Sequence, residues 1–301
     1  MSTRGRPIQV VNRYTRAVEV EEIYGGGWLR WTYETAGGRL ALALLLRRAF
    51  FSRWFGWSMS RPASRARIAP FIRDFRLDPA EFADPVESFR SFNDFFSRRL
   101  REDARPLLAP AGDPVFPADG RHLGVADVSA TTQFYAKGQH FDLEKLVGDR
   151  DLVRRFVGGA MVISRLCPVD YHRFHFPVAG RAGTPVLLDG PLYSVSPIAL
   201  RRRLECLVEN KRARTLIETT NIGGVLVFEI GATCVGTIVH TAGAGTVERG
   251  AEKGYFRFGG SCVITLFEPG RVRLADDLLE AAKEGRELYA RVRDRMASAV
   301  G

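Results

Sequence analysis

Cysteines are few in this sequence: it has four in 301 residues, and no two of them form a C-x-x-C pair. This spacing argues against a zinc site and against a disulfide framework, and it is typical of a reducing compartment. The sequence also lacks an uninterrupted apolar run of about 18 residues, so it predicts no transmembrane helix. Its first residues are polar and basic without the apolar core of a secretory signal, so we expect no such signal. These absences indicate a cytosolic or membrane-surface protein.

Acidic residues are absent between Arg39 and Arg73, where eight arginines occur. The whole chain carries a formal net charge of +10, which favours anionic partners such as acidic lipids, acidic metabolites or nucleic acid. Residues 28–59 are rich in leucine and aromatic residues, a pattern that predicts helices. These helices could lie in a membrane interface or pack as a hairpin on their own core. No nucleic-acid-binding signature occurs, so we expect no nucleic-acid partner.

Short apolar runs separated by glycines follow after about residue 113, which predicts a mostly antiparallel β domain rather than alternating βαβ units. Candidate strands are residues 152–156, 159–163, 186–188, 225–230, 234–240, 256–258 and 262–267. Ser91 is expected to cap a short helix over residues 91–100, and residues 276–296 read as a terminal helix. The sequence therefore predicts an α+β fold with a helical, basic N-terminal region over residues 1–104 and a β-rich main domain over residues 105–301.

A Gly-Gly-Ser turn ending at Ser261 precedes the last apolar run, and by itself it is typical of a tight turn between two strands. Two histidines, His172 and His175, lie three residues apart, so they would share one face of a helix or point to opposite faces of a strand. Asp119 stands in an Asp-Gly pair that is typical of an Asx turn. The histidines show no zinc-ligand spacing, so no metal is expected. Together, however, a serine, a histidine and an aspartate can form an activated oxygen nucleophile.

A series of short blocks surrounds these residues in a fixed order along the chain. The blocks are Asn12-Arg13-Tyr14, Phe50-Phe51-Ser52, Phe55-Gly56-Trp57, Phe92 to Leu100, Pro117 to Gly120, Tyr171 to Val178, Glu209 to Arg212, Gly231 to Gly236, and Phe258 to Ser261 followed by Leu266-Phe267-Glu268. In this order they resemble the bacterial phosphatidylserine decarboxylases, and the resemblance runs nearly end to end. Singly the blocks are weak signals, but five core blocks in sequence are specific.

The resemblance implies a proenzyme that cuts itself between Gly260 and Ser261. The Ser261 hydroxyl would attack the carbonyl carbon of Gly260, and elimination and hydrolysis would leave a pyruvoyl group derived from Ser261. His175 is implied as the base that deprotonates Ser261, Asp119 as the residue that orients His175, and His172 as the group that assists decarboxylation and reprotonation. The pyruvoyl group would form a Schiff base with the substrate, so neither a metal nor PLP is expected.

The resemblance further implies a carboxy-lyase of phospholipid biosynthesis that converts phosphatidylserine to phosphatidylethanolamine and CO₂. Its expected partners are phosphatidylserine, an anionic membrane surface on the cytoplasmic side of the cell membrane, and the second self-cleavage fragment in a heterodimer, with homo-oligomerisation left open. Two alternatives are a pyruvoyl-dependent decarboxylase of a soluble amino acid and a non-catalytic membrane-binding relative. Cys262 stands where the family commonly has threonine, which leaves open a cleavage site shifted by one residue.

Overall fold

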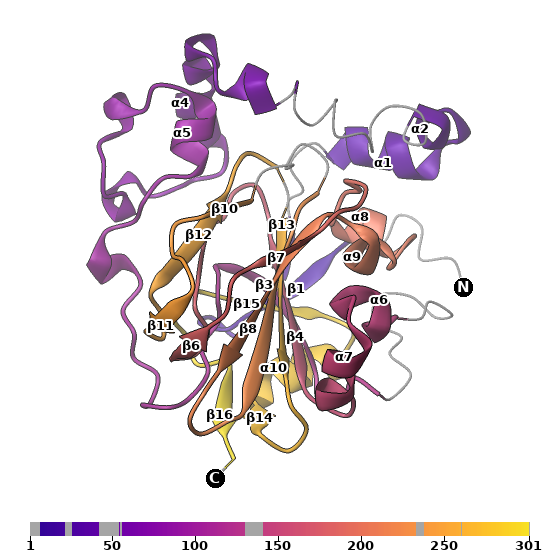
Figure 1. Ribbon diagram of the computed structural model, residues 1–301. Coiled ribbons are helices and arrows are strands. Elements are labelled where there is room, and N and C mark those ends of the chain that lie inside the picture. The colour runs from indigo at the N-terminus through magenta and orange to yellow at the C-terminus, as the bar shows by residue number, and fades with distance from the viewer. Residues whose placement is uncertain are drawn as a thin grey trace.

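A large, twisted β-sheet forms the centre of the molecule (Figure 1). The computed structural model describes residues 7–21, 26–41, 54, 56–129, 141–232, 238–259 and 261–300. Within these residues the sheet has 11 strands, which are antiparallel to their neighbours except for the parallel pair β1 and β15. Their order is β11 (Gly245–Val247), β6 (Gly180–Ala182), β8 (Arg212–Glu218), β9 (Gly224–Ile230), β13 (Ser261–Phe267), β4 (Met161–Leu166), β3 (Gly120–Val125), β15 (Glu287–Ala290), β1 (Gln9–Asn12) and β2 (Val18–Val20), with β7 (Val186–Leu188) paired to β8.

The two faces of this sheet carry different cores, because successive residues of a strand point to opposite faces. Val263 and Phe267 of β13 belong to one buried cluster, whereas Ile264 belongs to the other. On the first face, here called the sandwich face, lies a second sheet in which Phe174 and Phe256 are buried. This second sheet contains the described strands β10 (Ile238–His240), β12 (Glu252–Phe256) and β5 (Arg173–His175).

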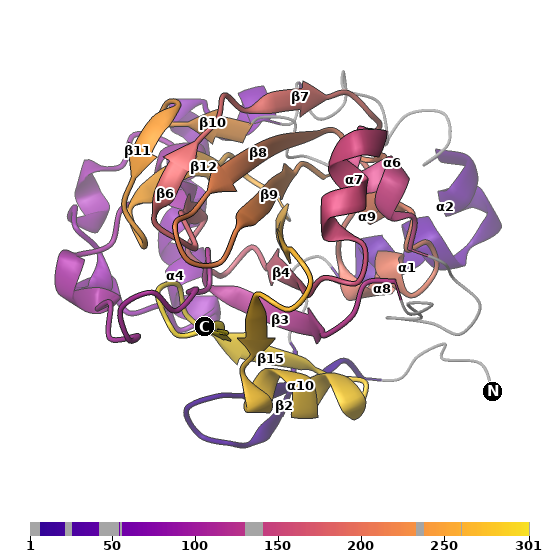
Figure 2. The same cartoon turned by 60° about the horizontal axis from the view of Figure 1, so that its bottom comes forward.

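Short helices cover the other face of the large sheet, here called the helix face, and bury Leu146, Phe156 and Leu207 against it. Figure 2 shows them gathered on one side of strands β8 and β9. These helices are α6 (Leu143–Val147), α7 (Arg150–Phe156), α8 (Pro197–Leu200) and α9 (Cys206–Glu209). The C-terminal part adds α10 (Asp276–Lys283), which packs on β3 and β15, and the hairpin of β14 (Val272–Leu274) with β16 (Ala297–Ala299).

A cluster of phenylalanines forms a third core at one end of the β-sandwich. Phe92, Phe95 and Phe96 are fully buried there, together with Phe258 from the segment just before β13. Asn93 ties the two parts together, because its side-chain oxygen accepts a hydrogen bond of 2.7 Å from the backbone N–H of Phe258. The helices of the N-terminal region are α1 (Gly26–Glu34), which packs on α8 in a separate small core, α2 (Ala36–Ala41), η2 (Pro62–Arg67), α4 (Ile68–Asp74), η3 (Pro79–Glu81), η4 (Val86–Ser88), α5 (Phe92–Phe96) and η5 (Glu102–Ala104).

The predicted α+β fold with a mostly antiparallel sheet is confirmed, but residues 152–156 are wrong as a strand. They lie in α7, where the side chain of Asp149 accepts a hydrogen bond from the N–H of Leu152 and caps the helix. The expected terminal helix over residues 276–296 is wrong beyond Lys283. The chain turns at Gly285, whose φ of 70° is left-handed, and then enters β15.

The first described residues form strands β1 and β2, which the sequence did not predict. They extend the large sheet beyond β15, so residues near the N-terminus pair with residues near the C-terminus. Of the helices expected over residues 28–59, α1 and α2 are present, whereas residues 42–53 lie outside the described part of the chain. Residues 233–237 of an expected strand also lie outside it, and the strand's last residues form β10. The boundary between residues 104 and 105 stays a prediction.

Candidate active site

Ser261 is the first residue of β13, and its side chain is fully buried. It pairs with Leu166 of β4 and points to the sandwich face, as does Val263 two residues later. Gly259 has a φ of 137°, a backbone conformation that residues with a Cβ atom rarely adopt. Gly260 itself lies outside the described residues. The serine therefore stands at the junction between a turn that requires glycine at Gly259 and a central strand.

His172 contacts the serine directly: its Nδ1 atom lies 3.2 Å from Ser261 Oγ. The other ring nitrogen, Nε2, lies 2.8 Å from the backbone oxygen of Cys167. A carbonyl oxygen only accepts hydrogen bonds, so Nε2 must carry the ring proton in the neutral tautomer. Nδ1 then accepts, and the Ser261 hydroxyl donates to it. This is the arrangement in which a histidine can take the proton of a serine nucleophile.

The surroundings keep His172 neutral. Burial lowers the pKa of His172 to about 3, and the nearby charge of Arg98 acts in the same direction. The ring of Phe96 stacks on the imidazole with a centroid distance of 3.9 Å, which shields it from water. At neutral pH the imidazole is therefore an unprotonated acceptor facing Ser261.

His175 makes a different set of contacts. Its Nδ1 atom lies 2.9 Å from the backbone oxygen of Gly250, so Nδ1 donates and Nε2 is left as an acceptor. Nε2 is buried and has no hydrogen-bond partner among the described residues. Burial lowers the pKa of His175 to about 4, so this ring is also neutral at pH 7. It offers a free acceptor in a dry environment.

Asp119 is buried, and its carboxylate accepts hydrogen bonds from an arginine and from a backbone N–H instead of from a histidine. Arg105 donates to both carboxylate oxygens, with a shortest distance of 2.7 Å, and the N–H of Val292 donates to one of them at 2.8 Å. The guanidinium of Arg105 also pairs with Glu81. The negative charge of Asp119 still reaches His175, whose pKa it raises against the larger lowering by burial. Asp119 thus acts on His175 through space and anchors the segment that follows β15.

The structure places His172 rather than His175 against Ser261, which differs from the arrangement that the resemblance implies. The chain is extended at His175 in β5, so side chains three residues apart point to opposite faces instead of sharing one. Only one of the two histidines can then meet the serine. Asp119 makes no hydrogen bond to either histidine among the described residues.

Cys262 points away from this site. It lies on the helix face, where it is fully buried with Ile264, whereas Ser261 points to the sandwich face. Burial raises the pKa of the Cys262 thiol, which disfavours the reactive thiolate. Both observations favour Ser261 as the nucleophile.

Sequence patterns did not single out several residues that build the site. The backbone oxygen of Cys167 fixes the tautomer of His172, and Arg105 holds Asp119. Arg105 follows Asp103-Ala104 without any motif, so no local signal could identify it. Phe96 and Arg98 both lie in the Phe-rich block 92–100, which the resemblance had marked but without roles for its members.

In the described part of the chain, no group of three or more His, Cys, Asp or Glu side chains is arranged to hold a metal ion. Of the helices described, none is long and apolar enough to cross a bilayer.

Comparisons with known proteins agree on one family. A family model described as phosphatidylserine decarboxylase matches residues 92–291. The phosphatidylserine decarboxylase proenzyme of Fusobacterium nucleatum is 39% identical over 274 residues, which cover 91% of each chain. The proenzyme of Chlamydia muridarum is 42% identical over 283 residues, 94% of each chain. That of Ruminiclostridium cellulolyticum is 39% identical over 281 residues, 93% of this chain and 94% of the relative.

Proposed function

Because the chain belongs to the phosphatidylserine decarboxylase family, we propose that it is a self-cleaving enzyme that converts phosphatidylserine to phosphatidylethanolamine and CO₂. The observation that carries this proposal is the hydrogen bond from the buried Ser261 hydroxyl to the neutral imidazole of His172. A serine at the end of a glycine turn, facing an unprotonated base, has the parts needed to attack the preceding peptide bond.

We propose that His172, rather than His175, is the base for self-cleavage. His172 Nδ1 takes the proton of the Ser261 hydroxyl, and the oxygen attacks the carbonyl carbon of Gly260. The peptide C–N bond breaks as the ester bond forms, and His172 returns the proton to the nitrogen of Ser261. The 3.2 Å contact and the single free lone pair on Nδ1 support this assignment.

Ser261 then supplies the cofactor. Loss of its α-proton breaks the ester C–O bond, residue 260 leaves as a carboxylate, and position 261 becomes a dehydroalanine. Uptake of water and release of ammonia leave a pyruvoyl group as the first residue of the small fragment. The fully buried position of Ser261 at the start of a central strand fits this group, because bulk water is kept from the reactive carbonyl.

For decarboxylation, the pyruvoyl group supplies an electrophilic carbonyl for the substrate amine and an electron sink for the loss of CO₂. We propose that His175 transfers the proton in this reaction. Its Nε2 is a buried acceptor with no partner among the described residues, so it is free to bind a donor on the substrate or to carry a proton to the product. Asp119 supports a protonated His175 through its charge.

We expect purified protein to consist of two chains, residues 1–260 and 261–301. The small chain should be lighter, by one ammonia, than a fragment with an intact N-terminal serine. Both chains should elute together in native buffer, because two strands of the small chain lie within the large sheet. Strand β13 is hydrogen-bonded to β9 and β4, and strand β15 is hydrogen-bonded to β3 and β1. Intact-mass spectrometry and size-exclusion chromatography check this. A persistent single chain with an unmodified Ser261 would contradict the enzyme proposal and favour a non-catalytic relative.

We further propose that the N-terminal helices dock the enzyme on the cytoplasmic surface of the cell membrane. Trp28 and Trp31 of α1 are 51% and 42% exposed, although their rings stack at 5.1 Å. Trp57 is 57% exposed, with the guanidinium of Arg61 over its ring. Exposed indoles next to arginines suit an interface where rings bury among acyl chains and guanidinium groups meet lipid phosphates.

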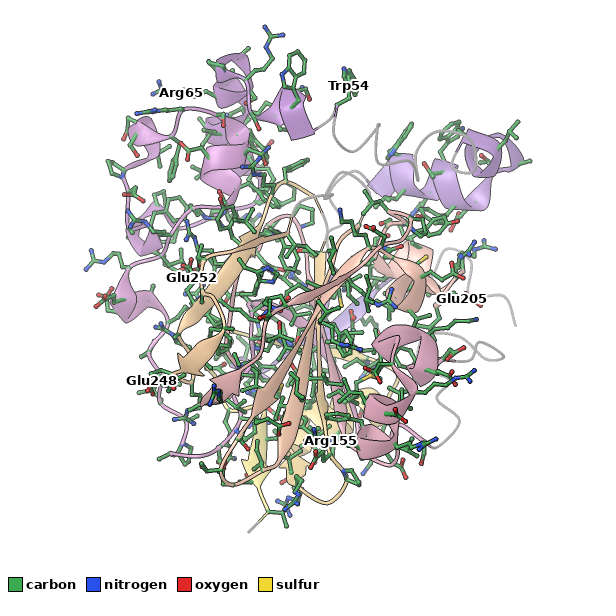
Figure 3. The ribbon with its side chains drawn as sticks, in the orientation of Figure 1. Trp54, Arg65, Arg155, Glu205, Glu248 and Glu252 are labelled. Carbon is green, nitrogen blue, oxygen red and sulfur yellow. The ribbon has the colours of Figure 1, made fainter. Side chains whose placement is uncertain are left out.

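These residues gather at one end of the molecule. In Figure 1, α1, α2 and α4 lie beyond the same end of the large sheet. Trp54 and Arg65 project from that end, whereas Arg155 lies at the opposite end (Figure 3). A single membrane-facing end is therefore consistent with all of these residues.

We expect replacement of both Trp28 and Trp31 by alanine to weaken binding to phosphatidylserine-containing vesicles about tenfold or more, because the lost area is apolar. Vesicle co-sedimentation measures this. The control is Leu108→Ala, which removes an 83% exposed apolar side chain outside the helices and should leave binding unchanged. Equal binding by all three proteins would refute the docking surface. Decarboxylation of free serine, without vesicle binding, would favour the soluble-substrate alternative.

A further inference from the structure

A cavity of about 380 Å³ lies beside the active site, between the phenylalanine cluster and the large sheet. Its lining holds five arginines and six Asp or Glu residues, and includes Arg98, Arg105, Asp119, Arg121, Asp170 and Tyr171. The last two directly precede His172 in the chain. Phe96, which stacks on His172, lies two residues before Arg98. The cavity and the Ser261 site therefore share a wall.

Most charges in this lining are satisfied by one another. Arg105 pairs with Asp119 and with Glu81, and Arg121 pairs with Asp170. The carboxylate of Asp170 also accepts the backbone N–H of Cys167. These pairs need no ligand to compensate them.

Arg98, in contrast to Arg105 and Arg121, makes no ion pair among the described residues. Its side chain lies in the cavity wall with only 4% of the residue exposed, and its guanidinium sits over the rings of Phe82 and Phe95 at 5.0 and 4.9 Å. Nη2 makes one long contact of 3.4 Å to the backbone oxygen of Asp170. Nε and Nη1 are buried and have no hydrogen-bond partner among the described residues. Buried donors of a charged group are costly to leave unpaired, so an arginine in a cavity wall with two unpaired N–H groups indicates a ligand site.

The charge of Arg98 persists in this setting. Burial lowers the pKa of Arg98 to about 10, which still leaves it protonated at neutral pH. The two phenyl rings hold the guanidinium plane in place at the cavity wall.

We propose that the guanidinium of Arg98 binds an oxyanion of the substrate headgroup in this cavity. The inference rests on the proposed function and assigns its substrate subsite. The phosphatidylserine headgroup carries a carboxylate and a phosphate, both of which are acceptors for a guanidinium. An anion held there lies beside Asp170 and Tyr171, which directly precede His172 in the chain, so we expect the amino group of the same headgroup to point toward the Ser261 site.

The test replaces Arg98 with glutamine and with lysine and measures self-cleavage and decarboxylation separately. Arg98→Gln should still cleave, because Arg98 does not contact Ser261 and burial, the larger cause, still keeps His172 neutral, but its KM for a short-chain phosphatidylserine should rise about 10- to 100-fold. Arg98→Lys, which keeps the charge, should show a smaller rise. The matched control is Arg99→Gln, since Arg99 is 60% exposed at its side chain and pairs with Asp84 at the surface. An unchanged KM in a cleaved, active Arg98→Gln protein would overturn the inference and leave the proposed function standing.

A second measurement needs no Arg98 variant. Crystals of the uncut Ser261→Ala chain are soaked with O-phosphoserine, with phosphoethanolamine and with serine. Density for an oxyanion against the Arg98 guanidinium supports the inference, and the ligand that produces it tells phosphate from carboxylate recognition. Headgroup density elsewhere, or none at Arg98 with any of the three ligands, contradicts it. The soaking result does not depend on enzyme activity. A failure of the enzyme proposal would appear separately, as native protein that stays uncut and inactive.

Discussion

Replacing Ser261 with alanine should leave the chain uncut and without decarboxylase activity. The hydroxyl of Ser261 is the proposed nucleophile and also the source of the pyruvoyl carbonyl, so its loss removes both the cleavage and the cofactor. Because no other group replaces it, we expect the rate of cleavage to fall about 10⁴-fold or more. Denaturing electrophoresis and CO₂ release from phosphatidylserine measure the two effects. The side chain is buried but small, so the fold should survive.

The matched control for this prediction is Cys262→Ser, one residue further along β13. Its side chain points to the helix face, away from His172, so cleavage should still occur at the same bond. The mass of the small fragment identifies the cut. Cleavage that persists in Ser261→Ala and moves by one residue would show that Cys262 is the nucleophile and would refute the geometry described above.

The second large effect is expected for His172→Ala. Since His172 is the neutral base in contact with the Ser261 hydroxyl, its removal should slow self-cleavage about 10²- to 10⁴-fold. His175→Ala should still cleave but should lose decarboxylation by a similar factor, because only the proposed proton transfer to the substrate is affected. Time courses of fragment formation and of CO₂ release separate the two steps.

The opposite pattern, with His175→Ala uncut and His172→Ala cleaved but inactive, would restore the assignment implied by the family resemblance. The pH dependence gives an independent check. Burial lowers the pKa of His172 to about 3, so the base stays unprotonated over the neutral range and is lost only when the pH falls toward that value. Cleavage by the native chain should therefore be nearly constant above about pH 5 and decline below it. A rate that instead follows a group near the ordinary histidine pKa of about 6.5 would contradict a buried base.

Local signals predicted local structure well. Ser91 caps α5 as expected, since its hydroxyl accepts the N–H of Asp94 at 3.2 Å, and the capping pattern lies within four residues. The apolar run 262–267 lies in β13 as expected, because this signal too is contained within a few neighbouring residues. The run 152–156 misled because its apolar residues suit a strand and a helix equally, and the deciding cap at Asp149 lies outside the run.

Long-range pairing could not be predicted in the same way. β1, near the N-terminus, pairs with β15, near the C-terminus. For example, Val10 pairs with Glu287, and no sequence pattern near either residue indicates this pairing. β15 is held by its pairing with β1 and β3, which no local pattern signals, and the expected terminal helix therefore extended too far. The role of Arg105 could not be predicted either, because it comes from the ion pair with Asp119 and not from a motif around Arg105.

The sequence by itself determined the composition of the site: a serine after two glycines, two histidines three residues apart, an aspartate before a glycine, and a Phe-rich block. These are properties of short segments, and they do not depend on how the chain folds. Only the tertiary structure decided which histidine meets Ser261, because that depends on an extended β5 and on the carbonyl of Cys167 that fixes the His172 tautomer. It also placed Arg98 in a cavity wall with two buried, unpaired N–H groups, a property that arises only when distant segments enclose a charge.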